Sequence, residues 1–272
     1  MSKLTTILGT ASVLGMALTA VPAAAATLTG FAGDVTTSYG QEDASHSSGN
    51  PKNWLLGGNI AGPLSDLMQL NFQFGASYTH NWEDHFSAEE WNLGGNVFWA
   101  NNDGRVGINA NYNTITHSGH VTNYGAFGEW YFGNITGMAK AGWVSSGGSP
   151  QGGNGNYLGA ALSGYFIPDL AITGGVEWAQ NISGQGCQIC GRTGFNETAL
   201  EIAAEFLFSE DYGVSGFAGY SHNTIRSHGQ DEDDNVWHVG LRWYVGGGSL
   251  IDHHRNGTLN PWLPGIGIHP VP

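Results

Sequence analysis

The chain contains few residues whose types and spacing could form a chemical site. Cys187 and Cys190 stand in Gly-Cys-Gln-Ile-Cys-Gly, a spacing that suits a small disulfide, a redox pair or half of a metal site. A redox pair needs a thioredoxin-like strand and helix around it, and a metal site needs two further ligands nearby. If the chain is exported, a disulfide is the expected state of these two cysteines, with free thiols and metal binding as the remaining alternatives.

The other residues that invite a metal site are acidic and imidazole side chains. Residues 231–234 form the acidic run Asp-Glu-Asp-Asp, which lacks the alternating ligand spacing and the turn glycine of a calcium loop. Histidines without a carboxylate or a cysteine at fixed spacing are weak evidence for metal binding. These histidines are His117 and His120, His222 and His228, and His253 and His254. We expect no metal site, and a solvated loop tip at the acidic run.

No arrangement of residues predicts catalysis. Ser221 and His222 could supply a nucleophile and a base, but neighbouring residues of a strand point to opposite faces, so the two cannot pair. The chain contains no nucleophile elbow, phosphate loop or zinc-protease helix. With 8 Lys and Arg against 22 Asp and Glu, it is also too acidic for nucleic-acid binding. The sequence therefore predicts neither an enzyme nor a cofactor.

Alternating apolar and polar residues dominate the rest of the chain. In residues 68–80, Met68, Phe72 and Tyr78 fall on one face and Gln69 and Gln73 on the other. Period 2 with a fully apolar face predicts a strand with one dry side. Similar segments of roughly ten residues recur from residue 27 to residue 246, and their number is about twelve, an even number as in single-chain bacterial outer-membrane barrels.

The links between these segments alternate in length. Short links follow the segments of even rank, and the one at residues 101–104 reads Asn-Asn-Asp-Gly, a hairpin turn signal. Longer links follow the segments of odd rank and include residues 40–53, 81–90, 180–197 and 223–234. Aromatic residues collect at both ends of the segments, where lipid headgroups would lie. Trp91, Trp143 and Trp237 lie toward the long links. Phe132, Phe208 and Trp243 lie toward the short ones.

Composition and the two ends of the chain fit export. Charged residues make up only 11%, glycine accounts for 44 of 272 residues, and the net charge is -14. Residues 1–26 read as a secretory signal, with Lys3 at the positive end, an apolar stretch and an alanine-rich cleavage site. Residues 247–272 have no strand pattern. We expect this tail to start in the periplasm as a disordered extension, with a plug of the lumen or a contact to another envelope component as alternatives.

The faces opposite the apolar ones are expected to line the interior of the barrel. Neutral hydrogen-bonding groups dominate them, with a few charges of both signs, and such groups suit a passage for small polar solutes. Glu177, Glu201 and Glu205 either form an acidic patch that favours cations or pair with Lys140 and Arg242 as a structural network. The expected lining residues are Asn71, Gln73, Asn96, Asn109, Asn111, Glu129, Lys140, Glu177, Glu201, Glu205, His238 and Arg242.

Across residues 27–246 the chain resembles the bacterial outer-membrane β-barrels of the porin-like group. The resemblance rests on the export signal, the strand pattern, the link lengths and the aromatic ends, and on no family-specific motif. It implies an all-β, antiparallel up-and-down transmembrane barrel in a Gram-negative-type outer membrane, in contact with its lipids and lipopolysaccharide and inserted by the barrel assembly machinery.

From this architecture we expect a channel for passive passage of small hydrophilic solutes, since a polar lumen follows from the residues above. Two alternatives remain. A structural or adhesive surface barrel would have a plugged lumen and use its outer loops for contact. A lipid-modifying hydrolase would need a serine, a histidine and an asparagine or aspartate that converge at the rim.

Overall fold

The strands of the chain close into a single barrel. The structure, a computed structural model, describes residues 30–44, 50–65, 69–83, 86–115, 119–147, 154–182, 195–227 and 230–258. The expected signal at residues 1–26 and both cysteines lie outside these residues. The strands are β1 (Ala32–Ala44), β2 (Lys52–Ser65), β3 (Leu70–Glu83), β4 (Phe86–Asn101), β5 (Gly104–Ile115), β6 (Gly119–Phe132), β7 (Ile135–Gly147), β8 (Asn154–Ile167), β9 (Leu170–Ile182), β10 (Phe195–Ser209), β11 (Val214–Ser227) and β12 (Gln230–Val245).

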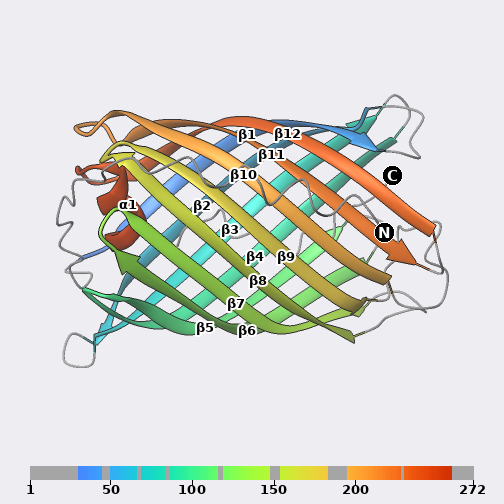
Figure 1. Ribbon diagram of the computed structural model, residues 1–272, viewed down its shortest axis with the longest axis horizontal. Helices are drawn as coiled ribbons and strands as arrows, with labels where there is room; N and C mark the ends of the chain where they lie inside the picture. The colour runs from blue at the N-terminus through green and yellow to red at the C-terminus, as the bar shows by residue number, and fades with distance from the viewer. Residues whose placement is uncertain are drawn as a thin grey trace, which may run out of the picture.

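Each strand pairs antiparallel with its neighbours in sequence, and β1 closes the barrel on β12 (Figure 1). The closing register runs from Gly33 opposite Val245 to Ala44 opposite Asp234. Closure leaves no strand edge unpaired, which is the condition for a sheet to cross a lipid bilayer. The predicted all-β, up-and-down barrel is therefore confirmed. Among the described residues, no helix is long and apolar enough to cross a membrane.

The short links gather at one end of the barrel, as the sequence predicts. At the β4–β5 turn, Asn101 Oδ1 accepts hydrogen bonds from the backbone amides of Asp103 (2.9 Å) and Gly104 (3.0 Å). This side-chain cap replaces a backbone partner and fixes the tight turn. We call this end the turn side, and the opposite end the loop side.

Two of the expected long links are mostly strand. β3 continues to Glu83 and β4 begins at Phe86, so residues 81–83 and 86–90 belong to strands. β12 begins at Gln230, which places the acidic run at residues 231–234 within a strand. The expectation of a loop there is wrong, although Asp231 and Asp233 are exposed to solvent as expected. Beyond the lipid a ladder of backbone hydrogen bonds needs no apolar face, so the hydrophobic pattern stops before the strand does.

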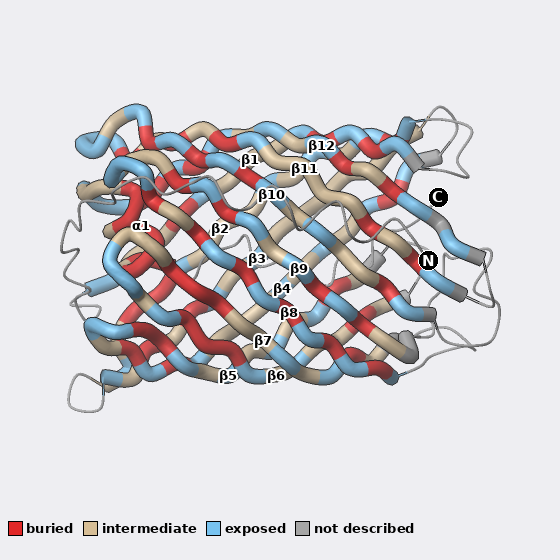
Figure 2. The backbone as a smooth tube through the Cα atoms, viewed as in Figure 1, coloured by how far each residue is buried: buried red, intermediate tan, exposed pale blue. Residues whose placement is uncertain are grey.

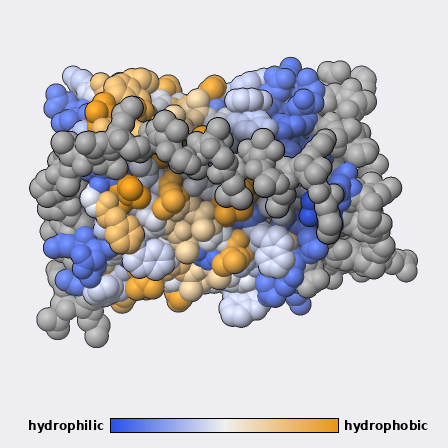
Figure 3. Space-filling model, viewed as in Figure 1, coloured by the Kyte–Doolittle hydropathy of each residue, from blue (hydrophilic) through white to orange (hydrophobic). Residues whose placement is uncertain are grey.

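The outer face of the barrel is apolar around its middle. β8 alternates exposed and buried residues along almost its whole length, and its exposed set includes Leu158, Leu162 and Phe166 (Figure 2). In Figure 3, apolar residues gather around the middle of the barrel and hydrophilic ones lie toward both ends. Apolar side chains that face outward from a closed barrel identify a transmembrane barrel of the outer-membrane type.

Aromatic pairs lie on the outer face near the loop side. The rings of Tyr220 and Trp237 are 4.4 Å apart between centroids, and those of Tyr78 and Trp91 are 4.7 Å apart. Each pair joins residues that stand opposite one another on neighbouring strands. Such amphipathic rings suit the level of the lipid headgroups.

The chain turns inward after β12. Residues Leu250–Asn256 form a short helix, α1 (Figure 1). Leu250, Ile251 and three further residues of this helix are buried. Ser249 caps the helix: its hydroxyl accepts from the amide of Asp252, and the Asp252 carboxylate accepts from the amide of Ser249. The expectation of a disordered extension is wrong for this part of the tail, while residues 259–272 lie outside the described residues.

Candidate functional site

The inner wall of the barrel carries the polar residues of the chain. Along β10 and β12, side chains four residues apart point to the same inner face, because side chains alternate with period 2. Glu205 of β10 and Arg242 of β12 meet across β11 with Oε2 and Nη1 2.8 Å apart. Farther toward the loop side, Glu201 and His238 approach to 4.0 Å. The barrel thus brings side chains from non-adjacent strands into contact.

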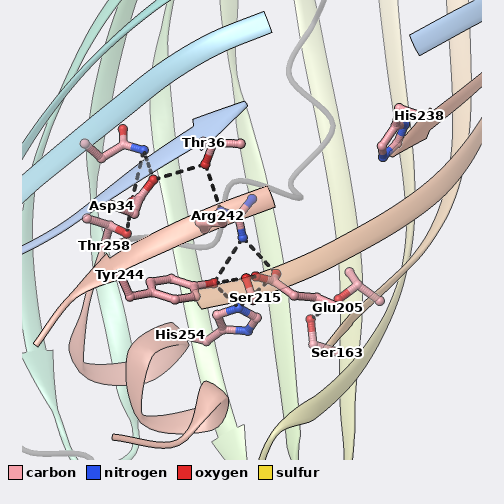
Figure 4. Close-up of polar contacts among 12 residues, drawn as sticks. Asp34, Thr36, Ser163, Glu205, Ser215, His238, Arg242, Tyr244, His254 and Thr258 are labelled. Atoms are coloured by element: carbon pink, nitrogen blue, oxygen red, sulfur yellow. Dashed lines mark hydrogen bonds and ion pairs between the residues drawn. The ribbon is translucent and has the colours of Figure 1, made fainter. Parts of the chain in front are cut away.

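A buried network surrounds Glu205 at the turn side (Figure 4). Its carboxylate accepts hydrogen bonds from Ser215 Oγ (2.6 Å) and Tyr244 Oη (2.8 Å) as well as from Arg242. His254 of α1 lies 3.4 Å from the same carboxylate through Nε2. Charge-assisted hydrogen bonds of this kind offset the desolvation of a buried ion pair.

Counting protons in this network fixes the orientation of the imidazole. The single Tyr244 hydroxyl proton is donated to Glu205, so the contact between Tyr244 Oη and His254 Nε2, at 2.9 Å, needs its proton from the imidazole. The other ring nitrogen, Nδ1, lies 3.0 Å from Tyr165 Oη. The contacts therefore place a proton on Nε2 of His254, and they tie α1 to β8, β10 and β12.

A second charged pair lies on the other side of the turn-side end. Arg105 of β5 and Glu129 of β6 are 3.8 Å apart, and both side chains are almost completely buried. The Arg105 guanidinium also lies 5.6 Å from the centre of the Phe98 ring. Tyr131 donates to Glu129 at 3.2 Å. Charge, aromatic rings and hydroxyls thus fill this end of the lumen.

The middle of the inner wall is more accessible. Lys140 and Glu177 form an ion pair of 2.8 Å, with the lysine side chain 11% exposed. His238 and Glu201 keep 18% and 14% exposure, against 3% and 1% for Arg242 and Glu205. Polar groups at mid-height therefore face a wetter environment than the turn-side network.

Carboxamides cover much of the wall from β2 to β6. Asn111 donates to Asn123 at 2.9 Å, and Asn109 donates to the hydroxyl of Tyr157 at 3.3 Å. Glycines stand beside such side chains: a Cβ at Gly94 would overlap the Asn111 amide oxygen, and one at Gly219 would overlap the His238 ring. The glycines therefore accommodate polar side chains that lie along the wall.

All twelve residues expected to line the lumen lie on the inner face of their strands. The structure joins Glu205 to Arg242, Lys140 to Glu177 and Glu201 to His238. Glu177, Glu201 and Glu205 do not act as one patch, because two of the three are paired with permanent cations. The remaining lining residues are Asn71, Gln73, Asn96, Asn109, Asn111 and Glu129, which lie along β3 to β6.

Sequence reasoning missed several members of the turn-side network. Asp34, Ser215 and Tyr244 lie on inner faces and follow from the strand pattern alone. His254 and Thr258 could not be found that way, because they lie in the unpatterned tail and reach the wall only in the folded chain.

At the loop-side rim, the structure does not bring Ser221 and His222 together as a pair. His222 Nδ1 instead lies 2.9 Å from Asn235 Oδ1, and its Nε2 lies 3.4 Å from the Thr224 hydroxyl. Thr224 donates its proton to Asp233 at 2.8 Å, so the proton is not directed at the imidazole. Within the described parts of the chain, no group of three or more His, Cys, Asp or Glu is placed to hold a metal ion.

Comparison with solved structures gives the same architecture. The NanC porin aligns with a TM-score of 0.52 at 9% identity, over 77% of this chain and 98% of that one. The KdgM porin aligns at 0.50 and 8% identity, over 77% and 98%. An outer membrane channel from Pseudomonas putida F1 aligns at 0.52 and 14% identity, over 79% and 94%. No protein family and no curated protein matches the chain by sequence.

At these identities the likeness shows the fold. The chain has the porin-like architecture of bacterial outer-membrane barrels, and its closed sheet with an apolar outer band fits location in that membrane.

Proposed function

We propose that this protein is an outer-membrane channel for the passive passage of small hydrophilic solutes. The observation that carries the proposal is the inner wall at mid-height. Lys140, Glu201 and His238 retain exposure although they lie inside the barrel. Carboxamides beside them offer donors and acceptors that can replace the hydration of a polar solute.

The charge of the wall favours cations and neutral solutes over anions. Arg105, Lys140 and Arg242 are each engaged by a carboxylate. Acidic side chains on the described inner faces outnumber them: Asp34, Glu42, Glu90, Glu129, Glu177, Glu197, Glu201, Glu205 and Asp234. An acidic lining raises the local concentration of cations and lowers that of anions.

Swelling of liposomes that contain the refolded protein tests the passage of neutral solutes. Vesicles with the protein should swell in an isosmotic small sugar faster than vesicles with none. They should swell more slowly in a large oligosaccharide, because twelve strands make a barrel of intermediate bore. Equal swelling of vesicles with and without the protein, in every solute, would contradict the proposal.

A structural or adhesive surface barrel is the second candidate. The packed turn-side end favours it, since buried charges and aromatic rings fill the lumen there. A barrel whose lumen never conducts would meet this description.

A further inference from the structure

The start of the C-terminal tail crosses the turn-side mouth of the barrel. At one side, the amides of Ile251 and Leu250 donate to the Pro168 carbonyl (3.0 Å) and to Asp169 Oδ1 (3.3 Å) in the β8–β9 turn. At the other side, the Thr258 hydroxyl donates to Asp34 Oδ2 on β1 (Figure 4). β1 and the β8–β9 turn are separated around the wall by β10, β11 and β12. The segment of residues 249–258 therefore bridges separate parts of the mouth, and we call it the C-terminal strap.

Further contacts anchor the strap around the wall. Arg255 donates to the carbonyls of Gly133 (2.7 Å) and Ile135 (3.0 Å) and to the Thr136 hydroxyl (3.1 Å). Arg105 of β5 donates to the carbonyls of His254 (3.3 Å) and Gly257 (3.2 Å). With the His254 contacts to β8, β10 and β12, the strap is held from most sides of the opening.

Apolar packing fills the space beside the strap. Leu250 and Ile251 pack in one cluster with Tyr165, Leu207 and Tyr244. On another part of the wall, a separate cluster consists of Phe98, Phe127, Ala61 and Ala100. All members of both clusters are at most 7% exposed. These side chains therefore pack at the turn-side mouth when the strap is docked.

The strap is joined to the barrel by a hinge. Gly246 and Gly248 have φ of +103° and +136°, a region that residues with a Cβ rarely adopt, and Gly247 lies between them. Three consecutive glycines let a chain turn sharply and change direction at little steric cost. A helix of 7 residues is also too short to be stable alone, so α1 depends on its docking contacts.

We propose that the C-terminal strap is a hinged gate that closes the turn-side mouth and opens by release from its side-chain anchors. The proposal rests on the channel function proposed above. None of the strap's anchors is a strand pairing, so release leaves the barrel ladder intact. Its two states are the docked strap and a strap displaced about the hinge at Gly246–Gly248.

Anchor variants of the full chain test the gate. Arg255→Gln removes a charge-assisted donor from the strap, and Thr258→Ala removes the contact with Asp34. Loss of the Arg255 anchor should raise the ratio of open to closed time in single-channel recordings about tenfold, and the double variant should raise it further. Asn256→Ala is the matched control, since the side-chain oxygen of Asn256 accepts no hydrogen bond among the described residues. Heat-modifiable migration in gels checks that each variant folds.

A cross-link tests the closed state directly. Asp34→Cys with Thr258→Cys, in a chain that also carries Cys187→Ser and Cys190→Ser, joins the strap to β1. Oxidation should hold the channel shut, and reduction should restore its openings.

The outcomes separate the gate from the channel. Conductance in the parent chain and in the anchor variants, with a larger open fraction in the anchor variants, supports both. Equal open-to-closed ratios in parent, control and anchor variants overturn the gate and leave the channel standing, as does a cross-linked protein that conducts like the reduced one. Silence from every folded variant overturns both.

Discussion

Glu205 and Arg242 form an ion pair of 2.8 Å between strands that are not neighbours, with side chains 1% and 3% exposed. Ser215 on the intervening strand donates to the same carboxylate. The pair therefore links three strands, and Tyr244 and His254 connect it to the C-terminal strap. One cluster of side chains thus contributes both to the stability of the barrel and to the docking of the strap at the turn-side mouth.

Removing one member of this pair should destabilise the barrel strongly. Arg242→Met leaves the Glu205 carboxylate buried without its cation, at an expected cost of about 3 to 5 kcal/mol in the free energy of unfolding. Urea unfolding of the refolded protein, followed by tryptophan fluorescence, measures this cost. Arg242→Met combined with Glu205→Gln should cost clearly less, because no charge is left unpaired. A double variant as unstable as Arg242→Met would show that lost packing, and not charge, dominates.

The cation preference of the channel should depend on the carboxylates that are not paired with a lysine or an arginine. Among the described residues, neither Glu197 nor Glu201 forms a salt bridge with lysine or arginine, whereas Glu205 is neutralised by Arg242. In a potassium chloride gradient at about pH 9, where both carboxyls are ionised, Glu197→Gln with Glu201→Gln should therefore shift the reversal potential toward zero. The control is Glu89→Gln, which changes an exposed carboxylate of β4. An equal shift in the control, or none in the double variant, would contradict the assignment.

The depth of a residue on the outer face should decide the cost of a charge there. Ile202 lies near the centre of β10 and is exposed, so Ile202→Arg should cost about 2 to 4 kcal/mol. Trp237 lies near the loop-side end of the apolar face, and Trp237→Arg should lose about 0 to 1 kcal/mol from the charge, besides the Tyr220 ring contact. Unfolding from lipid vesicles compares the two. The cost of Trp237→Ala is subtracted from that of Trp237→Arg to leave the cost of the charge. If this cost equals that of Ile202→Arg, no membrane boundary lies between the two positions.

Acid should loosen the docked strap. Burial lowers the pKa of His253 below its ordinary value and the neighbouring His254 lowers it further, while Asp252, Glu205 and Asp169 act in the opposite direction. The docked state thus favours the neutral imidazole. The contribution of the neutral His253 imidazole to docking is complete above the ordinary histidine pKa of about 6.5. It is lost as the pH falls through the lowered pKa of the docked state. The open-to-closed ratio should rise as the pH falls below about 6.

His253→Gln provides the control for this pH dependence, since glutamine does not titrate. In this variant, the open-to-closed ratio should change less with pH than it does in the parent chain. A variant with the same pH response as the parent chain would assign the response to another group.

The strands could be predicted from the sequence because contact with lipid requires an apolar residue at every second position. From Leu158 to Phe166, every residue of β8 that faces outward is apolar or small, so Leu158, Leu162 and Phe166 appear at even spacing in the sequence. The strand ends at residues 81–83, 86–90, 223–227 and 230–234 could not be predicted, because the strand ladder continues there without any requirement for an apolar face.

The cross-lumen contacts could not be predicted as pairs. Glu205 and Arg242 are 37 residues apart, and their contact depends on the closed barrel that brings β10 and β12 around β11. The strap could not be predicted from the sequence either, because α1 has only 7 residues and its buried side includes His253, His254 and Arg255. Sequence alone shows these as polar residues in an unpatterned tail. Their burial follows only from the wall residues that bind them.

Single-channel recording of the refolded full chain in planar bilayers, beside Arg255→Gln, tests the central claim most directly. The proposed channel predicts discrete conductance steps, a reversal potential that favours potassium over chloride, and a larger open fraction in the variant. Folded protein that gives no steps in either form would contradict the channel and leave the surface-barrel function as the better account.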